Sequence, residues 1–278
     1  MVSNLEKAPL EPFLRLVFFA MNQLSVSLLQ ADLVWENKQA NLDKLETLMK
    51  DISKIDVIVL PEMFPTGFSM KPESLYENAG GESLIWMKKL AKEKNAAICG
   101  SVIVREGSDY FNRLYFVEPS GEVHKYDKHH LFTLAGEEKV YTAGKEHLIV
   151  DFRGWKIMPL VCYDLRFPAW CRNTQEADLQ IFVANWPERR SEAWKTLLKA
   201  RAIENMCYLV GVNRVGADGN AILHSGDSAV YDELGTQIGA PTPFKEEVLT
   251  ITLHRDKMLE SRKRFNFLND RDSFTILK

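Results

Sequence analysis

Three segments of the sequence are each predicted to be a short β-strand that ends in a reactive side chain. The run from Ile157 to Val161 leads to Cys162, the segment VIVLPE ends at Glu62, and the segment GEVHKYDK ends at Lys128. In α/β proteins, functional groups gather at the carboxyl ends of strands. If all three segments are strands, a thiol, a carboxylate and an ammonium group could meet in one cleft.

This set of groups suits acyl transfer from an amide or a nitrile through a thioester. A thiol needs a base to become a thiolate, and Glu62 could take the proton and pass it to a departing amine. Lys128 could stabilise a tetrahedral oxyanion, together with the backbone N–H of Tyr163, which follows the cysteine.

Each of these side chains also has an ordinary explanation. A free cysteine after an apolar strand is more often a packed hydrophobic residue than a nucleophile. Glu62 follows Pro61 and could start a turn, and Lys128 could be solvated. His129 and His130 offer a rival Cys–His pairing. Adjacent residues on a strand point in opposite directions, so at most one of these histidines could reach the cleft.

The elements that must position these groups alternate along the chain. Segments 24–30 and 56–62 are typical of strands, whereas 40–52 and 82–95 have the apolar spacing of helices. This alternation predicts an α/β or α+β sandwich. Further strands are predicted at 96–106, 112–119, 121–128, 155–162, 179–184, 208–216, 228–235, 236–241 and 247–253.

A third long helix is predicted at 191–207, with Ser191 as its N-cap. No internal repeat and no Pro/Gly/Ser-rich linker divides residues 21–278, which predicts one domain. The residues of the helix predicted to face the core are Trp194, Leu197, Leu198 and Ile203.

The composition excludes several classes of protein. The 278 residues are 46% hydrophobic and 26% charged, with a formal net charge of -3, which is ordinary for a globular protein. No basic stripe indicates nucleic-acid binding, and no run of 18 apolar residues indicates a membrane span. The four cysteines form no metal-ligand spacing, so no metal is expected, and free thiols are typical of a reducing cytoplasm. A thiol redox protein would need a resolving cysteine, and Cys171 lies nine residues beyond Cys162.

Residues 1–20 are predicted to be an extension outside the fold. Their apolar run FLRLVFFA is interrupted by Arg15 and preceded by Glu6 and Glu11, unlike a signal peptide with its basic start and longer apolar core. Met21 stands directly before the first predicted strand and is a plausible natural start.

Taken together, the motifs resemble those of the nitrilase superfamily of carbon–nitrogen hydrolases. That family carries a Glu–Lys–Cys triad in three ordered motifs, which this sequence has as LPEMF, DKHHLF and CYDLRFP, within a likeness that spans about residues 21–270. The resemblance implies a four-layer α-β-β-α sandwich, a homodimer, and no metal or organic cofactor. It also implies that Glu62 is the general base, Lys128 the oxyanion-stabilising lysine and Cys162 the nucleophile. Glu137, rather than its neighbour Glu138, would orient the lysine and the base.

Finer details resemble the ω-amidase branch of this superfamily. They are TGF after Glu62, the tract 184–220, and GDSAVYDELG. The resemblance implies hydrolysis of 2-oxo diacid monoamides (2-oxoglutaramate and 2-oxosuccinamate) to ammonia and a 2-oxo dicarboxylate, beside a glutamine-dependent transaminase. Another amidase, a carbamoylase, a nitrilase or a non-catalytic binding member remains an alternative.

The residues around the triad are expected to bind the substrate or to support the nucleophile. A small anionic substrate needs an aromatic wall and a cationic anchor, for which the candidates are Phe68, Trp186 and one of Arg166, Arg189 or Arg190. Asp164 and Arg166 are also expected to stabilise the turn after the nucleophile, with a carboxylate as the partner of the arginine.

Deleting residues 1–20 should leave activity and melting temperature nearly unchanged, because their composition fits no element of the fold. The comparison is kcat/KM and Tm for the full chain and for a chain that begins at Met21. A loss of solubility, or a fall of several degrees in Tm, would show instead that FLRLVFFA packs on the domain or at a dimer interface.

Overall fold

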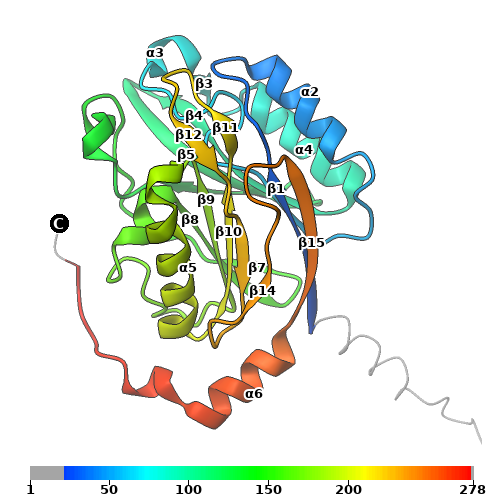
Figure 1. Cartoon of the computed structure of the whole chain (residues 1–278), viewed down its shortest axis with the longest axis vertical. Coiled ribbons are helices and arrows are strands. Elements are labelled where there is room, and N and C mark those ends of the chain that lie inside the picture. Colours follow the sequence, from blue (N-terminus) through cyan, green and yellow to red (C-terminus); the bar gives the residue numbers. More distant parts are fainter. Residues whose placement is uncertain (1–21, 277–278) are drawn as a thin grey trace, which may run out of the picture.

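The structure, a computed structural model, describes residues 22–276 and contains two stacked β-sheets (Figure 1). The first sheet has the order β15-β1-β2-β4-β5-β6, with the short β3 paired to β4. Its central strands β1, β2 and β4 are parallel, and β15, β5 and β6 extend it with antiparallel pairs. The strands are β1 (Gln23–Gln30), β2 (Val57–Val59), β3 (Glu77–Asn78), β4 (Ala97–Glu106), β5 (Asp109–Val117), β6 (Val123–Asp127) and β15 (Glu247–His254).

The second sheet repeats this plan, with the order β14-β13-β10-β9-β8-β7. Strands β8, β9 and β10 are parallel, so their carboxyl ends meet at one edge. A separate hairpin is formed by β11 (Val215–Ala217) and β12 (Leu223–Ser225). The strands of the sheet are β7 (Val150–Phe152), β8 (Trp155–Val161), β9 (Leu179–Ala184), β10 (Tyr208–Asn213), β13 (Ala229–Tyr231) and β14 (Gln237–Gly239).

Helices cover the outer faces of both sheets. Helices α2 (Lys38–Leu48) and α4 (Glu82–Lys94) lie on the first sheet, and α5 (Ser191–Asn205) lies on the second (Figure 1). One large apolar core fills the space between the sheets, because the inward faces of β1, β2, β8, β9 and β10 are all apolar. The predicted four-layer α-β-β-α sandwich is therefore confirmed.

Shorter elements connect the layers or follow them. Helix α3 (Pro72–Leu75) precedes β3, and α6 (Arg255–Phe265) follows β15 and buries Met258. In the part of the chain that the structure describes, no helix is both long and apolar enough to cross a membrane. The 3₁₀ helices are η1 (Thr133–Ala135), η2 (Glu137–Lys139), η3 (Cys162–Arg166), η4 (Glu188–Arg190) and η5 (Phe267–Asp270).

Two predictions for the third long helix were wrong. Its N-cap is Arg190, and the hydroxyl of Ser191 instead donates a hydrogen bond to Asp227 at 2.7 Å. The side chain of Ile203 is 47% exposed, whereas Trp194 and Leu198 are buried. At 100° per residue, position 203 lies about 180° around the helix from position 194, on the opposite face.

Other elements also differ from the predictions. The strand predicted at 56–62 ends at Val59, because Leu60 and Pro61 leave the strand and a turn begins at Glu62. The strand predicted at 208–216 is divided at Arg214 into β10 and β11, because the chain leaves the second sheet there to form a separate hairpin. Helix α6 was not predicted; most of its side chains are exposed, so it lacks an apolar stripe of helical spacing.

Candidate active site

A cavity of about 480 Å³ opens at the carboxyl ends of the parallel strands. Cys162 follows β8 directly, Lys128 follows β6, and Asn185 and Trp186 follow β9. The structure therefore brings together residues that lie far apart in the sequence. Those predicted for the site that line this cavity are Phe68, Lys128, Cys162, Tyr163, Arg166, Trp186, Arg189 and Arg190.

At the cavity wall, the ammonium group of Lys128 lies between two carboxylates. Lys128 Nζ is 3.0 Å from Glu62 Oε1, and it is 3.1 and 2.9 Å from the two carboxylate oxygens of Glu137. The side chains of all three residues are fully buried. Asn112 Nδ2 donates to Glu62 Oε1 at 2.8 Å and lies 3.4 Å from Glu137 Oε1. The ammonium group of Lys128 thus has carboxylate oxygens as its hydrogen-bond acceptors, and the amide of Asn112 is a further hydrogen-bond donor to the carboxylates.

The backbone fixes both carboxylates. The amide N–H of Asn185 donates to Glu62 Oε2 at 2.8 Å, and the side chain of Asn185 donates to the carbonyl of Glu62 at 2.6 Å. These bonds join the turn after β2 to the end of β9, and so they join the two sheets. On the other side, the amide of Phe132 donates to Glu137 Oε2 at 2.6 Å. Glu62 therefore keeps one oxygen on the lysine and one on a backbone amide.

The charges of this cluster favour uptake of a proton. Burial alone would lower the pKa of Lys128, but Glu137 and Glu62 outweigh burial, so its pKa is raised and it stays protonated. Burial raises the pKa of Glu137, although Lys128 opposes that shift. Two carboxylates share the one ammonium group, so the cluster can accept a proton from a group in the cavity.

Cys162 occupies a strained position at the entry to η3. Its φ of 42° lies in the left-handed region, which costs a non-glycine residue roughly 1–3 kcal/mol. Cys162 is 8% exposed as a whole residue, and it lines the cavity. Burial raises the pKa of the thiol well above its usual range, and the negative charge of Glu62 raises it further. The thiol therefore rests in its neutral form and needs a base to react.

Asp164 holds the turn after Cys162 in place. One carboxylate oxygen accepts hydrogen bonds from the amide of Val161 at 3.1 Å and from the hydroxyl of Tyr126 at 2.7 Å. The other accepts from the amide of His130 at 2.9 Å. Asp164 is fully buried, so these bonds also satisfy a carboxylate that would otherwise be costly.

The structure does not support the Cys–His pairing. Among the described residues that line the cavity, neither of the adjacent histidines is present. The ring of His129 stacks on Trp170 with centroids 3.6 Å apart. The ring of His130 stacks on Phe167, also at 3.6 Å, and its Nδ1 lies 2.9 Å from Asp164. Both rings therefore pack against the segment that follows Cys162, not against the cavity.

Arginines and aromatic rings form the rest of the cavity wall. The guanidinium of Arg166 lies 4.8 Å from the ring centroid of Trp186, and that of Arg190 lies 5.1 Å from the ring of Phe132. The carboxylate partner predicted for Arg166 is thus replaced by an aromatic face. Burial lowers the pKa of Arg190, and so does the nearby charge of Arg189. These cations crowd one side of the cavity, which makes that side attractive to an anion.

Two residues of the site were missed from the sequence. Asn185 stands directly after β9, so the strand-end pattern that singled out Cys162 could have found it. Asn112 lies inside β5, where one asparagine in a strand gives no signal of a role. Only the fold shows that its side chain reaches both carboxylates.

Comparison with known proteins assigns the family. The family model described as carbon-nitrogen hydrolase matches residues 25–263. The chain is 44% identical over 259 residues to the omega-amidase YafV of Yersinia enterocolitica, covering 92% of this chain and all of that protein. It is 37% identical to the 2-oxoglutaramate amidase of Bacillus subtilis, over 76% of this chain and 83% of that protein. The protein therefore belongs to the carbon–nitrogen hydrolase family, as its motifs predicted, and is a hydrolase.

A solved structure agrees with this assignment. XC1258 of Xanthomonas campestris is described as a CN-hydrolase superfamily protein with an arsenic adduct in its active site. It superposes with a TM-score of 0.89 at 42% identity, covering 91% of this chain and 99% of that one. Yeast Nit3, at 20% identity and a TM-score of 0.78, shares the fold.

Replacing Lys128 with methionine should destabilise the protein by about 3–5 kcal/mol at neutral pH, because two buried carboxylates lose their cation. Without the lysine, the pKa of Glu137 rises further above its unfolded value. A carboxyl group with a raised pKa favours the folded state at acid pH, and that contribution is lost as the pH rises through the folded pKa. The loss in Tm should therefore be small near pH 5 and large near pH 8.

Lys89→Met is the matched control, because Lys89 is an exposed lysine that pairs with Glu46. That variant should change stability by less than about 1 kcal/mol at either pH. Equal losses in Tm for Lys128→Met at pH 5 and pH 8 would contradict the charge arrangement described above.

Proposed function

We propose that this protein is an ω-amidase with Cys162 as the nucleophile, Glu62 as the general base and Lys128 as the oxyanion-stabilising group. The observation that carries the proposal is the cluster of Glu62, Lys128 and Glu137, fully buried beside a strained cysteine that lines a cavity. The names of the two similar amidases support the same activity.

In the first half of the reaction, Glu62 accepts the proton of the thiol as the sulfur of Cys162 attacks the amide carbon. The negative charge moves to the former carbonyl oxygen. There the ammonium of Lys128 and the backbone N–H of Tyr163 stabilise it. Glu62 then gives its proton to the amide nitrogen, the carbon–nitrogen bond breaks, and ammonia leaves behind a thioester.

In the second half, Glu62 takes a proton from water as the water oxygen attacks the thioester. The tetrahedral intermediate collapses, the sulfur regains a proton, and the carboxylic acid product is released. Glu137 acts through Lys128: its two oxygens hold the ammonium at 3.1 and 2.9 Å and so determine where the positive charge lies.

The proposed substrates are 2-oxoglutaramate and 2-oxosuccinamate. Each has an amide at one end and a carboxylate at the other, and the product is a 2-oxo dicarboxylate. Phe68 and Trp186 would form the aromatic wall, and Arg166, Arg189 or Arg190 would bind the carboxylate. Such an anchor fixes the amide carbon at about 3–3.5 Å from the attacking sulfur, a near-attack geometry.

The wider setting of the enzyme is also a proposal. We expect one catalytic domain at 21–278, a homodimer, a cytoplasmic location, and a glutamine-dependent transaminase that supplies the oxo-acid amide. Two rival functions are less well supported. A non-catalytic binding protein would have no need of the intact triad. A redox role would need Cys171 as partner, but its thiol donates to the carbonyl of Asp164 at 3.0 Å.

The substrate proposal predicts that kcat/KM for 2-oxosuccinamate exceeds that for butyramide by roughly ten- to a hundred-fold. That factor corresponds to one charge-assisted hydrogen bond of about 1.5–3 kcal/mol in a dry pocket. Of Arg166→Gln, Arg189→Gln and Arg190→Gln, the variant that removes this preference identifies the anchor, while its rate with butyramide should stay the same.

A simple aliphatic nitrile serves as the third substrate in the same assay. Equal kcat/KM values for 2-oxosuccinamate and butyramide would contradict the ω-amidase proposal. A dominant rate with the nitrile would move the protein to the nitrilases of the same superfamily.

A further inference from the structure

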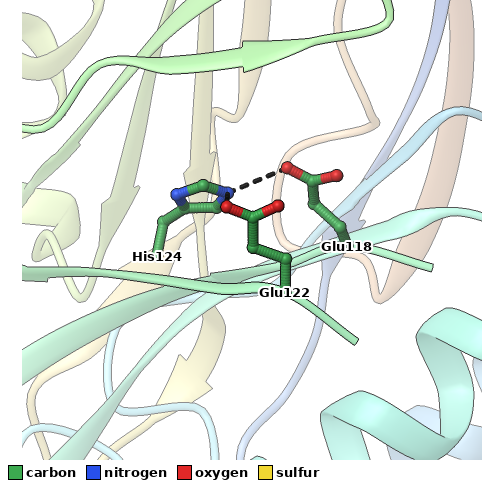
Figure 2. A group of neighbouring side chains, drawn as sticks. All are labelled: Glu118, Glu122 and His124. Carbon is green, nitrogen blue, oxygen red and sulfur yellow. Dashed lines mark hydrogen bonds and ion pairs between the residues drawn. The ribbon is translucent and has the colours of Figure 1, made fainter. Parts of the chain in front are cut away.

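Three side chains with metal-binding donor atoms meet at the turn that joins β5 to β6 (Figure 2). They are Glu118, Glu122 and His124. The ring nitrogen Nε2 of His124 lies 2.8 Å from a carboxylate oxygen of Glu118 and 3.7 Å from one of Glu122. All three donor atoms lie within 4.8 Å of one another. The group is therefore compact and combines one imidazole nitrogen with two carboxylate oxygens.

The backbone of the hairpin brings these side chains together. The antiparallel register pairs Phe116 with His124, and the amide of Glu118 donates to the carbonyl of Glu122 at 2.9 Å. Side chains alternate between the two faces of a strand, so residues 118, 122 and 124 share one face. A second bond, from the amide of Gly121 to the carbonyl of Glu118, closes the turn at 2.9 Å. The donor atoms are thus placed by a short hydrogen-bonded loop.

The two carboxylates of this group would be stabilised by a cation. Like charges directly opposite each other on paired strands destabilise the pairing. The ion pair shown for each of the two glutamates is with the same histidine. A protonated imidazole balances one negative charge, whereas a divalent metal ion balances both. A metal would also turn the repulsion of the carboxylates into shared coordination.

The spacing of the donor atoms fits a small tetrahedral ion. Zinc binds histidine nitrogen and carboxylate oxygen at about 2.0–2.2 Å, which in a tetrahedron places neighbouring donors roughly 3.3–3.6 Å apart. The two separations from His124 Nε2, 2.8 and 3.7 Å, lie on either side of this range, and all three donor atoms lie within 4.8 Å of one another. Side-chain rotations would bring the three donors to equal spacing, and a water molecule would complete the fourth position.

The surroundings also suit a bound metal. The side chains of His124 and Glu118 are 21% and 17% exposed, so two of the three ligands are held within the structure. The ring of Phe116 packs against the imidazole with centroids 6.3 Å apart, and Phe152 packs against Phe116 in turn. This apolar support orients the imidazole, while Glu122, at 64% exposed, leaves a path for the ion to enter.

We propose that Glu118, Glu122 and His124 bind one zinc ion or a divalent ion of similar chemistry. The site is distinct from the cavity: in β6, His124 precedes Lys128 by four residues, roughly 13 Å along an extended strand. Its role is structural. The ion cross-links the turn at one end of the strand that carries Lys128 at its other end.

The test is a calorimetric titration of the full chain with zinc chloride, in a Cys162→Ala background. That substitution removes the cavity thiol, which is itself a zinc ligand. The site predicts one zinc ion per chain with a Kd near or below about 10 µM. Glu122→Gln and His124→Asn, each added to this background, should weaken binding by about tenfold or more, because each removes a ligand.

Glu46→Gln is the matched control, because Glu46 is a partly exposed glutamate whose ion pair is with a lysine. It should bind zinc as the background does. Zinc should also raise Tm in the background and in this control, and it should raise Tm by less in the two ligand variants. Glu122→Gln changes a mostly exposed side chain, and circular dichroism without metal verifies that both ligand variants fold.

Two results would overturn the proposal: no zinc binding below about 100 µM in the background, or the same affinity in both ligand variants. The first result would show that the three side chains form an ion-pair cluster only, and the second would place the zinc elsewhere. The titration involves no turnover, so its outcome is independent of the amidase proposal.

Discussion

The ammonium group of Lys128, buried between the carboxylates of Glu62 and Glu137, is the interaction on which the rest of the site depends. Removing three charges from water costs several kcal/mol for each ion, and close contacts repay that cost only in good geometry. The protein supplies such geometry through the amides of Asn185 and Phe132. The cluster thus exists only when several loops have reached their final positions.

This requirement explains why the site lies at the meeting of the two sheets. Glu62 comes from the first sheet and Asn185 from the second, and they are joined by bonds of 2.8 and 2.6 Å. Cys162 follows the last residue of β8 and adopts a left-handed backbone conformation. Asp164 stabilises this turn by accepting a hydrogen bond from the amide of Val161. The sandwich core holds these two edges together, and the cost of burying the charges is offset by the packing of that core.

Features of the site that depend on local sequence could be predicted, whereas those that depend on contacts between distant strands could not. The strand-end pattern placed Cys162 directly after β8 and Lys128 directly after β6. The apolar run before Cys162 is a strong local signal, whereas the mostly polar segment before Lys128 was recognised from the turn residues that precede it. The role of Asn112 depends on register between distant strands, which no local pattern records. The error at Ile203 has a different origin, since helical geometry already placed it opposite Trp194. The sequence also gave no signal of the proposed zinc site, because Glu118, Glu122 and His124 are brought together by a hairpin turn.

In the proposed mechanism, the buried cluster activates the sulfur of Cys162 for covalent chemistry. The most direct test is mass spectrometry of the enzyme quenched with acid during turnover of 2-oxosuccinamate. We expect an adduct with the mass of the substrate less ammonia, on the peptide that contains Cys162, and neither adduct nor turnover in Cys162→Ala. Ammonia release by Cys162→Ala at the wild-type rate, or an adduct on another residue, would contradict it.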